Sequence, residues 1–386
     1  MEVFFMPWRD KTVEDLRKEF VLSAEQTKNF SALCREFGIT RRTGYKWFNR
    51  YKKGQSLTDK SKKPNNIANR TPRKTEKLIT DLRTHNPGWG AKTLKKVLEN
   101  QGHEDIPCVK TVNNILNRYG CISEEESLKH KPYQRFEKSQ CNELWQTDFK
   151  GEFLTADDKY CFPLDILDDH SRFLIKIKPH LNTVNVVIST FEAAFEEYGM
   201  PRAILSDNGR QFSGLKHGFT QFEKWLMNLD ILPIHGRIKH PQTQGKIERF
   251  HRTLNNELLK HTVFKDINDA DEKLQIWRDK YNNIRPHEAL NMKCPSEVYV
   301  PSNRTYTGKI ENFAYGGQFH VVKVNSWGYV RFGGWQVYLS ETMINEYIEF
   351  RPSHNGKSFI ACYRNYKIAE FDAQTGQLIH RKISRM

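Results

Sequence analysis

The middle of the chain alternates between short apolar runs and longer segments in which apolar residues recur every three or four positions. The short runs predict strands, and the longer spacing predicts amphipathic helices. The predicted elements are, in order, strands at 144–150, 160–167 and 172–178, a helix at 184–198, a strand at 203–206, a helix at 218–229, a strand at 232–235, and helices near 243–260 and 269–283. This order predicts a mixed sheet flanked by helices.

Apolar residues closer to the N-terminus have the spacing of two short helices. The first ends at Gly38, and Thr40 can cap a second helix over 41–50. In the second helix, Trp47 and Phe48 are expected to face inward and the basic and hydroxyl side chains outward. Two short helices joined at a glycine favour a helix-turn-helix, whose second helix enters the major groove of DNA. The alternative is a helical hairpin with a solvated basic face.

Three further apolar stripes follow, each with helical spacing. They consist of Leu78, Ile79 and Leu82, then Leu94, Val97 and Leu98, and finally Val109, Val112, Ile115, Leu116 and Tyr119. Gly120 comes directly after the last stripe and is a typical helix stop. The pattern predicts a small three-helix bundle that ends there.

The composition changes after Pro301, where Tyr, Phe, Val, Gly and Trp alternate with polar residues. Alternation over 319–324, 334–339, 347–350 and 359–364 predicts short strands and a small β-barrel-like domain. By contrast, a segment before the three-helix bundle is rich in Lys, Asn, Ser and Pro and has no periodicity, so it is interpreted as a basic linker.

These patterns divide the chain into six segments, in agreement with a length of 386 residues, which suffices for several domains. The segments are a first helix-turn-helix domain (1–55), a basic linker (56–73), a second helical domain (74–122), a connector (123–142), a mixed-sheet core (143–300) and a C-terminal β domain (301–386).

Basic residues are concentrated in the first third of the chain. The formal net charge is +15 at pH 7, and residues 41–74 contain 12 basic side chains and one acid, Asp59. A basic run is commonly a solvated loop, but this density beside a helix-turn-helix pattern favours neutralisation of DNA phosphates. The residues expected nearest the DNA are Arg41, Arg42, Thr43 and Lys46.

The sequence lacks the run of about 18 apolar residues that a transmembrane helix needs. The charged start also lacks the apolar stretch of a signal peptide, so we expect a cytoplasmic protein without membrane contact. Seven cysteines are scattered without a Cys-x-x-Cys pair, which favours reduced thiols over disulfides or a zinc site.

Three acidic residues stand where a metal-dependent phosphoryl-transfer site needs them. Asp148 lies in the first predicted strand of the core. Asp207 follows the buried strand at 203–206, and Glu248 lies in a basic, helix-forming stretch. Mg²⁺ or Mn²⁺ prefers carboxylate oxygens, and two such ions can flank a phosphodiester during in-line displacement. We therefore predict that these three residues are catalytic and bind two ions.

Each acid also has a simpler interpretation. An aspartate before Asn-Gly is commonly a turn residue, which is the alternative for Asp207. Glu248 could form a surface pair with Arg252, worth a few tenths of a kcal/mol. Asp165, inside the second strand of the core, is the main rival to Asp148.

The helix that carries Glu248 has two distinct faces. A stripe at three- and four-residue spacing is expected to be buried and consists of Ile247, Phe250, Leu254 and Leu258. Glu248 and Arg252 lie on the adjoining face. Lys246, Arg249 and Arg252 are therefore candidates for contacts with the phosphates of DNA.

Three histidines near these motifs, His240, His251 and His287, could take part in proton transfer. Because a site that binds divalent ions needs no histidine base, structural or DNA-contacting roles are favoured for all three.

The motifs around the acids resemble the catalytic core of DDE transposases and retroviral integrases, in the version found in bacterial insertion-sequence transposases. The resemblance covers about residues 141–300 and depends on motifs that occur in the same order. They are Trp-Gln-Thr-Asp at 145–148, Leu-Asp-Asp-His-Ser-Arg at 167–172, Leu-Ser-Asp-Asn-Gly at 205–209, His-Pro-Gln-Thr-Gln-Gly-Lys-Ile-Glu-Arg at 240–249, Tyr-Asn-Asn at 281–283 and Arg-Pro-His at 285–287.

The resemblance implies an RNase H-like fold for 143–300, a second helix-turn-helix domain at 74–122 and a weakly specific DNA-binding domain at the C-terminus. For the C-terminal domain, a purely structural or oligomerising role is the alternative. It also implies that residues 168–172 form a structural turn between two core strands. In this family a basic residue usually stands seven positions after the catalytic glutamate, whereas this chain has Asn255.

The expected function is that of a DNA transposase. The N-terminal domains would bind the terminal inverted repeats of an insertion sequence, and the core would cleave the ends and join them to target DNA. Coordinated joining of two ends implies a homo-oligomer on double-stranded DNA. Two alternatives remain open: a helix-turn-helix regulator that has lost catalysis, and an RNase H-like nuclease that acts on RNA–DNA hybrids.

Overall fold

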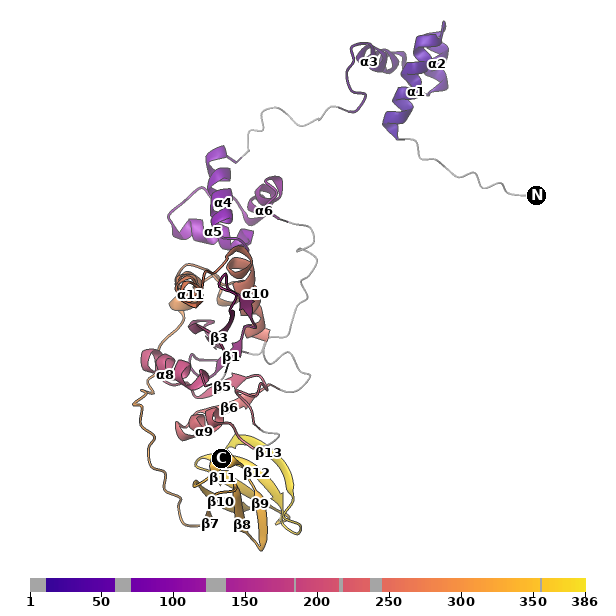
Figure 1. Ribbon diagram of the computed structural model, residues 1–386. Coiled ribbons are helices and arrows are strands. Elements are labelled where there is room, and N and C mark those ends of the chain that lie inside the picture. The colour runs from indigo at the N-terminus through magenta and orange to yellow at the C-terminus, as the bar shows by residue number, and fades with distance from the viewer. Residues whose placement is uncertain are drawn as a thin grey trace, which may run out of the picture. The chain divides into compact units, whose positions relative to one another are not determined.

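The computed structural model describes residues 12–59, 71–122, 137–183, 185–214, 218–236, 245–354 and 356–386. The chain separates into two compact units, Met1–Arg70 and Thr71–Met386 (Figure 1). Most of the expected linker and connector lies outside the described residues, as does His240. In the described part of the chain, no helix has the length and apolar character needed to cross a membrane.

The described part of unit 1 consists of α1 (Val13–Gln26), α2 (Phe30–Glu36) and α3 (Arg41–Lys52). Thr40 caps α3 as predicted, because its side chain accepts a hydrogen bond from the backbone N–H of Thr43. The second helix of the expected helix-turn-helix therefore begins where the sequence indicates.

The helices of unit 1 pack around one small core. Its buried members are Phe20, Val21, Ala24, Leu33, Cys34, Trp47 and Leu57. Trp47 is buried as predicted, whereas Phe48 is only partly buried against this core. At Gly44 an added Cβ would lie 2.7 Å from Cys34 Sγ, so a larger residue in α3 would push α2 away.

Unit 2 begins with the bundle of α4 (Arg73–His85), α5 (Ala91–Asn100) and α6 (Val109–Arg118). The predicted stripes form its core, except for Val109 and Tyr119, which are 36% and 51% exposed. The prediction is wrong for these two because Val109 is the first residue of α6 and Tyr119 follows its last. Both residues lie at the ends of α6 and are open to solvent, although the Tyr119 hydroxyl still contacts Glu76 of α4.

A charged residue lies inside this bundle. Glu76 of α4 is fully buried, and its carboxylate accepts hydrogen bonds from Arg118 Nη1 at 2.6 Å and from Tyr119 Oη at 2.9 Å. Both partners lie at the end of α6, so Glu76 joins the first helix of the bundle to the last.

The central sheet of unit 2 is mixed, as predicted. Its strands are β1 (Trp145–Phe149), β2 (Phe153–Leu154), β3 (Tyr160–Asp168), β4 (Leu174–His180), β5 (Ala203–Ser206) and β6 (Leu232–His235). β1 lies between β3 and β5, β4 pairs with β3, and β6 pairs with β5. The pairs β1–β3 and β3–β4 are antiparallel, whereas β1–β5 and β5–β6 are parallel.

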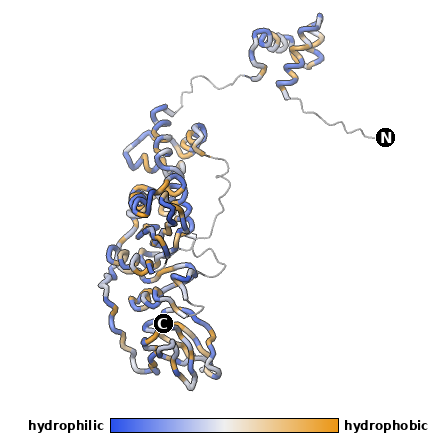
Figure 2. Tube along the Cα trace, viewed as in Figure 1, coloured by the Kyte–Doolittle hydropathy of each residue, from blue (hydrophilic) through white to orange (hydrophobic). Residues whose placement is uncertain are grey.

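Helices cover both faces of this sheet (Figure 1). On one face α8 (Val187–Tyr198) and α9 (Gln221–Asn228) pack against residues such as Trp145 and Ile204. On the other, α10 (Gly245–Glu257) and α11 (Ile267–Asn283) pack against Leu167, Leu174 and Ile177. Hydrophobic and hydrophilic residues alternate at short intervals along these elements (Figure 2), as expected for elements buried on one side. Short 3₁₀ helices η2 (Leu259–His261), η3 (Glu288–Leu290) and η4 (Pro295–Glu297) complete this region.

The C-terminal region consists of strands, as predicted. They are β7 (His320–Lys323), β8 (Tyr329–Phe332), β9 (Trp335–Tyr338), β10 (Tyr347–Pro352), β11 (Ser358–Tyr363), β12 (Tyr366–Asp372) and β13 (Leu378–Arg385), with η5 (Glu341–Met343) before β10. One sheet has the order β13-β12-β11-β10-β7, and β8 and β9 form a hairpin. No pairing among the described strands closes these sheets into the expected barrel.

This C-terminal domain shares its hydrophobic core with α9. Phe219 and Met227 are buried in the same cluster as Phe350, Tyr363 and other residues of the C-terminal strands.

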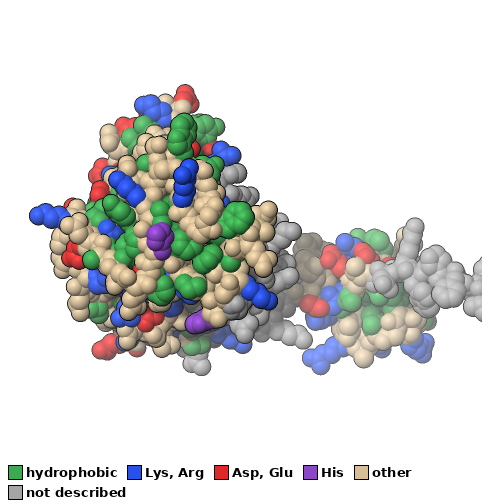
Figure 3. Space-filling model, turned by 90° about the horizontal axis from the view of Figure 1, so that it is seen from below, with side chains coloured by type: hydrophobic (Ala, Val, Ile, Leu, Met, Phe, Trp, Pro, Cys, Tyr) green, Lys and Arg blue, Asp and Glu red, His purple; other side chains and the backbone are tan. Residues whose placement is uncertain are grey.

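The face of the molecule seen in Figure 3 shows Lys and Arg side chains dispersed among hydrophobic and other residues, without one continuous basic patch.

Candidate active site

The strands β1 and β5 bring two of the predicted catalytic acids to the same edge of the sheet. They are parallel neighbours, and Gln146 stands opposite Leu205. Two positions further along each strand come Asp148 and Asp207. Asp207 lies directly after the last residue of β5, and its charge acts on Asp148, so the two carboxylates are neighbours at the carboxyl ends of the strands. In open α/β sheets this edge is where ligands bind.

The two acids affect each other electrostatically. Burial raises the pKa of Asp148 to about 6, with the negative charge of Asp207 adding to the effect and nearby His251 opposing it. A histidine accompanies Asp148: His251 Nδ1 lies 4.0 Å from Asp148 Oδ2. Two neighbouring carboxylates, one of them largely buried, carry negative charge that a divalent cation would offset. These side chains therefore fit Mg²⁺ or Mn²⁺.

Asp207 also has the turn role that its sequence context suggests. Its Oδ1 accepts a hydrogen bond of 2.9 Å from the backbone N–H of Gly209, and Asn208 Nδ2 donates to Gly236 O at 2.8 Å. A Cβ added at Gly209 would lie 2.9 Å from Asp207 Oδ1. The loop therefore holds the acid through one oxygen, and any side chain at Gly209 would press on it.

Glu248 lies in the first turn of α10, with Ile247, Phe250 and Leu254 buried below it as predicted. Glu248 itself is exposed. Among the described residues, no group of three or more His, Cys, Asp or Glu could jointly hold a metal ion. The structure thus brings Asp148 and Asp207 together without adding Glu248 to them. Residues 237–244, directly before α10, lie outside the described part of the chain.

Asp165, the rival candidate to Asp148, is not accessible to solvent. It stands opposite Asp148 in the antiparallel pair of β1 and β3 and is fully buried, and burial raises its pKa. Its Oδ2 lies 2.7 Å from His251 Nε2, whereas its Oδ1 finds no hydrogen-bond donor among the described residues. His251 is therefore hydrogen-bonded inside the protein, which supports the structural role among those favoured for it. His287 is half-buried, and the burial of its ring lowers its pKa well below the usual range.

The structural role predicted for residues 168–172 is also confirmed. Asp168 is fully buried and accepts hydrogen bonds from the backbone N–H groups of Asn142 and Ser171, each at 2.8 Å. The Ser171 hydroxyl adds a third bond at 2.7 Å. These bonds close the turn between β3 and β4.

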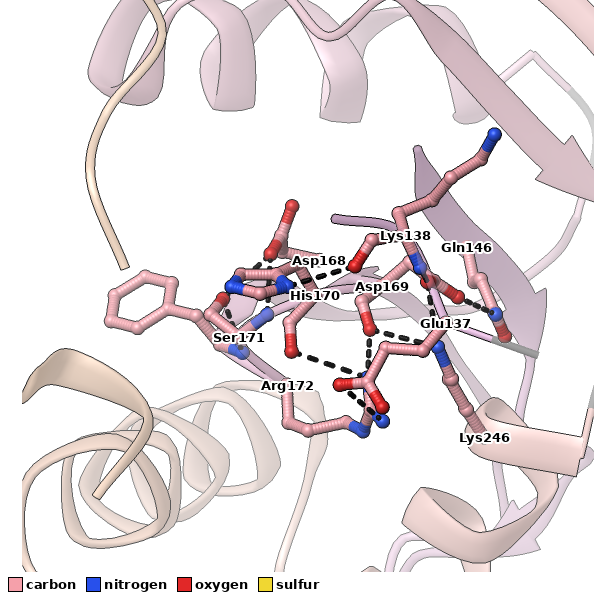
Figure 4. Close-up of polar contacts among 10 residues, drawn as sticks. Glu137, Lys138, Gln146, Asp168, Asp169, His170, Ser171, Arg172 and Lys246 are labelled. Atoms are coloured by element: carbon pink, nitrogen blue, oxygen red, sulfur yellow. Dashed lines mark hydrogen bonds and ion pairs between the residues drawn. The ribbon is translucent and has the colours of Figure 1, made fainter. Parts of the chain in front are cut away.

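Asp169, beside it, is the centre of a second buried group (Figure 4). Its carboxylate accepts hydrogen bonds from Lys138 N–H at 2.8 Å, from Gln146 Nε2 at 2.7 Å and from Lys246 Nζ at 2.6 Å. We call Asp169, Lys138, Gln146 and Lys246 the Asp169 cluster.

The candidate DNA-binding residues of α3 lie at its start and along one exposed side. Arg41, Arg42 and Lys46 are exposed, and Lys46 Nζ lies 4.8 Å from the centre of the Trp47 ring. Thr43 is half-buried and takes part in the helix cap.

The three basic candidates on α10 differ from one another. Arg249 and Arg252 are exposed, as a contact with phosphates requires. The side chain of Lys246 is only 14% exposed and is paired with Asp169 inside the protein. A contact of Lys246 with DNA would therefore break an internal ion pair.

The sequence analysis did not predict two side-chain pairs, Lys246 with Asp169 and His251 with Asp165. Features of the sequence could have indicated both. Asp165 lies within an apolar strand and Asp169 at its end, where an ionised carboxylate needs a donor. Lys246 and His251 stand on either side of the buried stripe of α10, which is where such donors can reach the sheet.

A polar cavity of about 500 Å³ lies at the other end of the strands. It is lined in part by Asn142 and Arg202, which precede β1 and β5, and by Arg304. Because Asp148 and Asp207 stand at the carboxyl ends of these strands, the cavity is separate from the acid pair.

Comparison with protein families matches most of the N-terminal two-thirds of the chain. A family model described as Integrase core domain matches residues 138–241, and another of the same description matches 229–295. Models described as Helix-turn-helix domain and Homeodomain-like domain match residues 16–65 and 43–116. The chain therefore carries an integrase core domain preceded by helix-turn-helix domains.

Comparison with curated proteins finds products of bacterial insertion sequences. The chain is 26% identical over 165 residues to the insertion element IS407 uncharacterized 31.7 kDa protein of Burkholderia multivorans, covering 42% of this chain and 57% of that protein. It is 21% identical over 241 residues to the transposase for insertion sequence element IS904 of Lactococcus lactis, covering 58% and 92%.

Coverage of these relatives is partial. The chain spans 57% of the IS407 protein and 46% of the insertion element IS476 protein of Xanthomonas euvesicatoria, about half the length of each. Among solved structures, the HTLV-2 integrase catalytic core domain in complex with magnesium is 18% identical, with a TM-score of 0.32, covering 42% of this chain and 97% of that one.

Proposed function

We propose that this chain, which joins helix-turn-helix domains to an integrase core domain and is similar to the transposases of bacterial insertion sequences, is a DDE-type DNA transposase. It binds the terminal inverted repeats of an insertion sequence, cleaves a DNA strand at each end and joins the freed 3′ end to target DNA. The observation that carries this proposal is the position of Asp148 and Asp207 at the carboxyl ends of adjacent parallel strands.

In this proposal Asp148, Asp207 and Glu248 hold Mg²⁺ or Mn²⁺, two ions in the complete site. Bound divalent ions supply activation of the attacking hydroxyl and charge stabilisation at the leaving 3′ oxygen. The two aspartates come from paired strands, so the protein holds them in place before DNA arrives. Glu248 is the third acid, presented by the helix beside them.

The basic residues divide between recognition and catalysis. Arg41, Arg42, Thr43 and Lys46 of α3 contact the DNA of the element ends, where phosphate contacts supply affinity and base contacts supply specificity. Arg249 and Arg252, exposed on the helix that carries Glu248, hold phosphates near the bond that is cleaved.

Joining two ends in a coordinated reaction implies that the protein acts as a homo-oligomer on double-stranded DNA. The core has an RNase H-like fold in this proposal, supported by its strand order β4-β3-β1-β5-β6. The chain is divided into domains at 1–55, 56–73, 74–122, 123–142, 143–300 and 301–386, and the second helical domain also contacts DNA.

The substitution Asp207→Asn tests the proposal. It removes the charge, while the amide oxygen can still accept the hydrogen bond from Gly209. The substrate is a labelled duplex that bears the inverted repeat flanking the gene. We expect the variant to lose cleavage and joining of this duplex in Mg²⁺ but to keep binding it. Asp157→Asn is the matched control because Asp157 is an exposed aspartate paired with Lys159 on the turn before β3, and it should leave both reactions unchanged.

Strand joining by the Asp207→Asn variant would contradict the assignment. Two further outcomes separate the alternatives. A wild-type protein that binds the repeat but never nicks it is a regulator, and one that prefers RNA–DNA hybrids over duplex DNA is a nuclease of another kind.

A further inference from the structure

Helix α10 is joined to the sheet by two side-chain pairs, one from a residue before Glu248 in the sequence and one from a residue after it. Lys246 Nζ lies 2.6 Å from Asp169 Oδ2, and His251 Nε2 lies 2.7 Å from Asp165 Oδ2. Both aspartates are fully buried, and the side chains of Lys246 and His251 are 14% and 13% exposed. Pairs this well shielded from water have stronger and more directional interactions than surface pairs.

The Asp169 cluster connects the start of this helix to the strand that carries Asp148. Gln146, two residues before Asp148 on β1, donates a hydrogen bond to Asp169 Oδ1, while Lys246 and Lys138 N–H bond to Oδ2 (Figure 4). One buried carboxylate therefore contacts β1 and the first turn of α10 together. A shift of the helix start relative to β1 would stretch these bonds.

The two pairs also determine how α10 is rotated about its axis. At about 100° per residue, Lys246 and His251 fall on opposite sides of the buried stripe of the helix. Glu248 lies roughly 60° from His251 on the side away from that stripe. Because His251 Nδ1 is 4.0 Å from Asp148 Oδ2, the His251 side of the helix is the side that faces Asp148. The rotation of α10 thus determines whether Glu248 is directed toward the aspartates.

We infer that Lys246 with Asp169, and His251 with Asp165, are positioning residues that set the height and rotation of α10 and so direct Glu248 toward Asp148 and Asp207. Apolar packing of the buried stripe keeps α10 against the sheet but allows the helix to slide along it. The two pairs are directional, so they prevent this sliding. This inference rests on the proposed function. It gives Lys246 a role inside the protein in place of the predicted contact with DNA phosphates.

The test compares Lys246→Met with Lys246→Arg in the full chain. Three properties are measured: binding of Mn²⁺ by electron paramagnetic resonance without DNA, affinity for the element end, and the single-turnover rate of strand cleavage. We expect Lys246→Met to weaken Mn²⁺ binding and slow cleavage by about 10- to 100-fold, as is typical when a group that orients metal ligands is removed. End affinity should be unchanged, and Lys246→Arg should restore most of both losses.

Lys273→Met is the matched control. It also removes a lysine and an ion pair, but its partner Asp269 lies on the same helix, α11, so the pair cannot orient α10. His251→Leu should reproduce the pattern of Lys246→Met, because it removes the bond to Asp165. A contribution to stability alone would lower the melting temperature and leave the Mn²⁺ affinity of the folded protein intact.

Removal of Lys246 leaves Asp169 buried without its cation, and that variant could fail to fold. The double substitution Lys246→Met with Asp169→Leu removes both charges and avoids this problem. A folded single or double variant that binds Mn²⁺ and cleaves DNA as the wild type does would overturn the inference.

Failure of this inference can be distinguished from failure of the proposed function. If Asp207→Asn loses Mn²⁺ binding and cleavage while Lys246→Met keeps both, the site is real and the positioning role is wrong. If the wild type neither cleaves DNA nor binds Mn²⁺ more tightly than Asp207→Asn, the proposed function itself fails.

Discussion

The surroundings of three buried carboxylates in unit 2 indicate their roles. Glu76 meets an arginine and a tyrosine, Asp169 meets a lysine, and Asp168 meets backbone N–H groups. Each of these charges is offset within the protein, as the cost of burying an ionised group demands. Asp148 has a second acid, Asp207, beside it from the adjacent parallel strand, and burial raises the pKa of Asp148 to about 6. A perturbed acid at a strand end is a typical sign of a functional site.

The buried Glu76 permits a stability test at this scale. Glu76→Ala removes hydrogen bonds to a charged group, each worth about 1.5–3 kcal/mol, although Arg118 can still reach solvent. We expect the free energy of local unfolding of the α4–α6 bundle to fall by about 1–3 kcal/mol. Native-state hydrogen exchange of amides in α4 and α6 measures the change.

The control for this prediction is Glu99→Ala, which removes a surface pair with Lys95 on α5 and should cost under about 1 kcal/mol. Equal effects of the two substitutions would show that burial of Glu76 adds nothing to the stability of the bundle.

At the scale of elements, most helices and strands could be predicted because each has a clear period of apolar residues. Strand β2 was not predicted, since two residues are too few to show alternation. The exposure of Val109 and Tyr119 could not be predicted, because the period of apolar residues does not reveal where α6 begins and ends. These errors arise where tertiary contacts, rather than local spacing, decide burial.

The candidate site could also be predicted only in part. Asp148 and Asp207 could be identified because each adjoins a recognisable strand, and strand pairing then brings them together. The position of Glu248 could not be predicted, because it depends on how α10 docks against β3. Docking depends on side-chain pairs between residues that are about 80 positions apart in the chain, such as Lys246 and Asp169.

Helix α3 permits a test of DNA recognition at this scale. The combined substitution of Arg41 and Arg42 by Ala should weaken end binding. It should also reduce the dependence of log Kd on log salt concentration by about 1 for each phosphate that the variant no longer neutralises. Binding titrations at several salt concentrations measure this slope.

The matched control replaces Lys18 and Lys28, exposed basic residues before α3 in unit 1, and should leave the salt dependence unchanged. An unaltered slope in the Arg41 and Arg42 variant would exclude these arginines from the DNA interface.

At the scale of the whole molecule, the C-terminal sheets are joined to the integrase core by a common hydrophobic cluster. Phe219 and Met227 come from the core, while Phe350 and Tyr363 come from the C-terminal strands. Local pattern predicted the strands but not this sharing, because the residues involved are more than 100 positions apart in the sequence. The domain therefore also has a structural role, whatever its contact with DNA.

Phe219→Ala tests this structural role. Truncation of a buried phenylalanine costs about 3–5 kcal/mol, and here the loss should reach the C-terminal strands because they share the cluster. We expect reduced hydrogen-exchange protection in β10, β11 and β12 as well as in α9.

Ile276→Ala on α11, where the side chain is 62% exposed, should change stability by under about 0.5 kcal/mol and serves as the control. A decrease of protection in α9 alone would mean that the two domains fold independently of each other.

The parallel pairing of β1 with β5 has a consequence for synthesis on the ribosome. The basic helix α3 emerges before β1, and β1 emerges well before β5 and α10. A nascent chain therefore carries the helix for which we propose a DNA contact before the acids can assemble. Under the proposed function, a product of premature termination before residue 203 would retain that helix and lack the paired acids, so it would occupy element ends without cutting them.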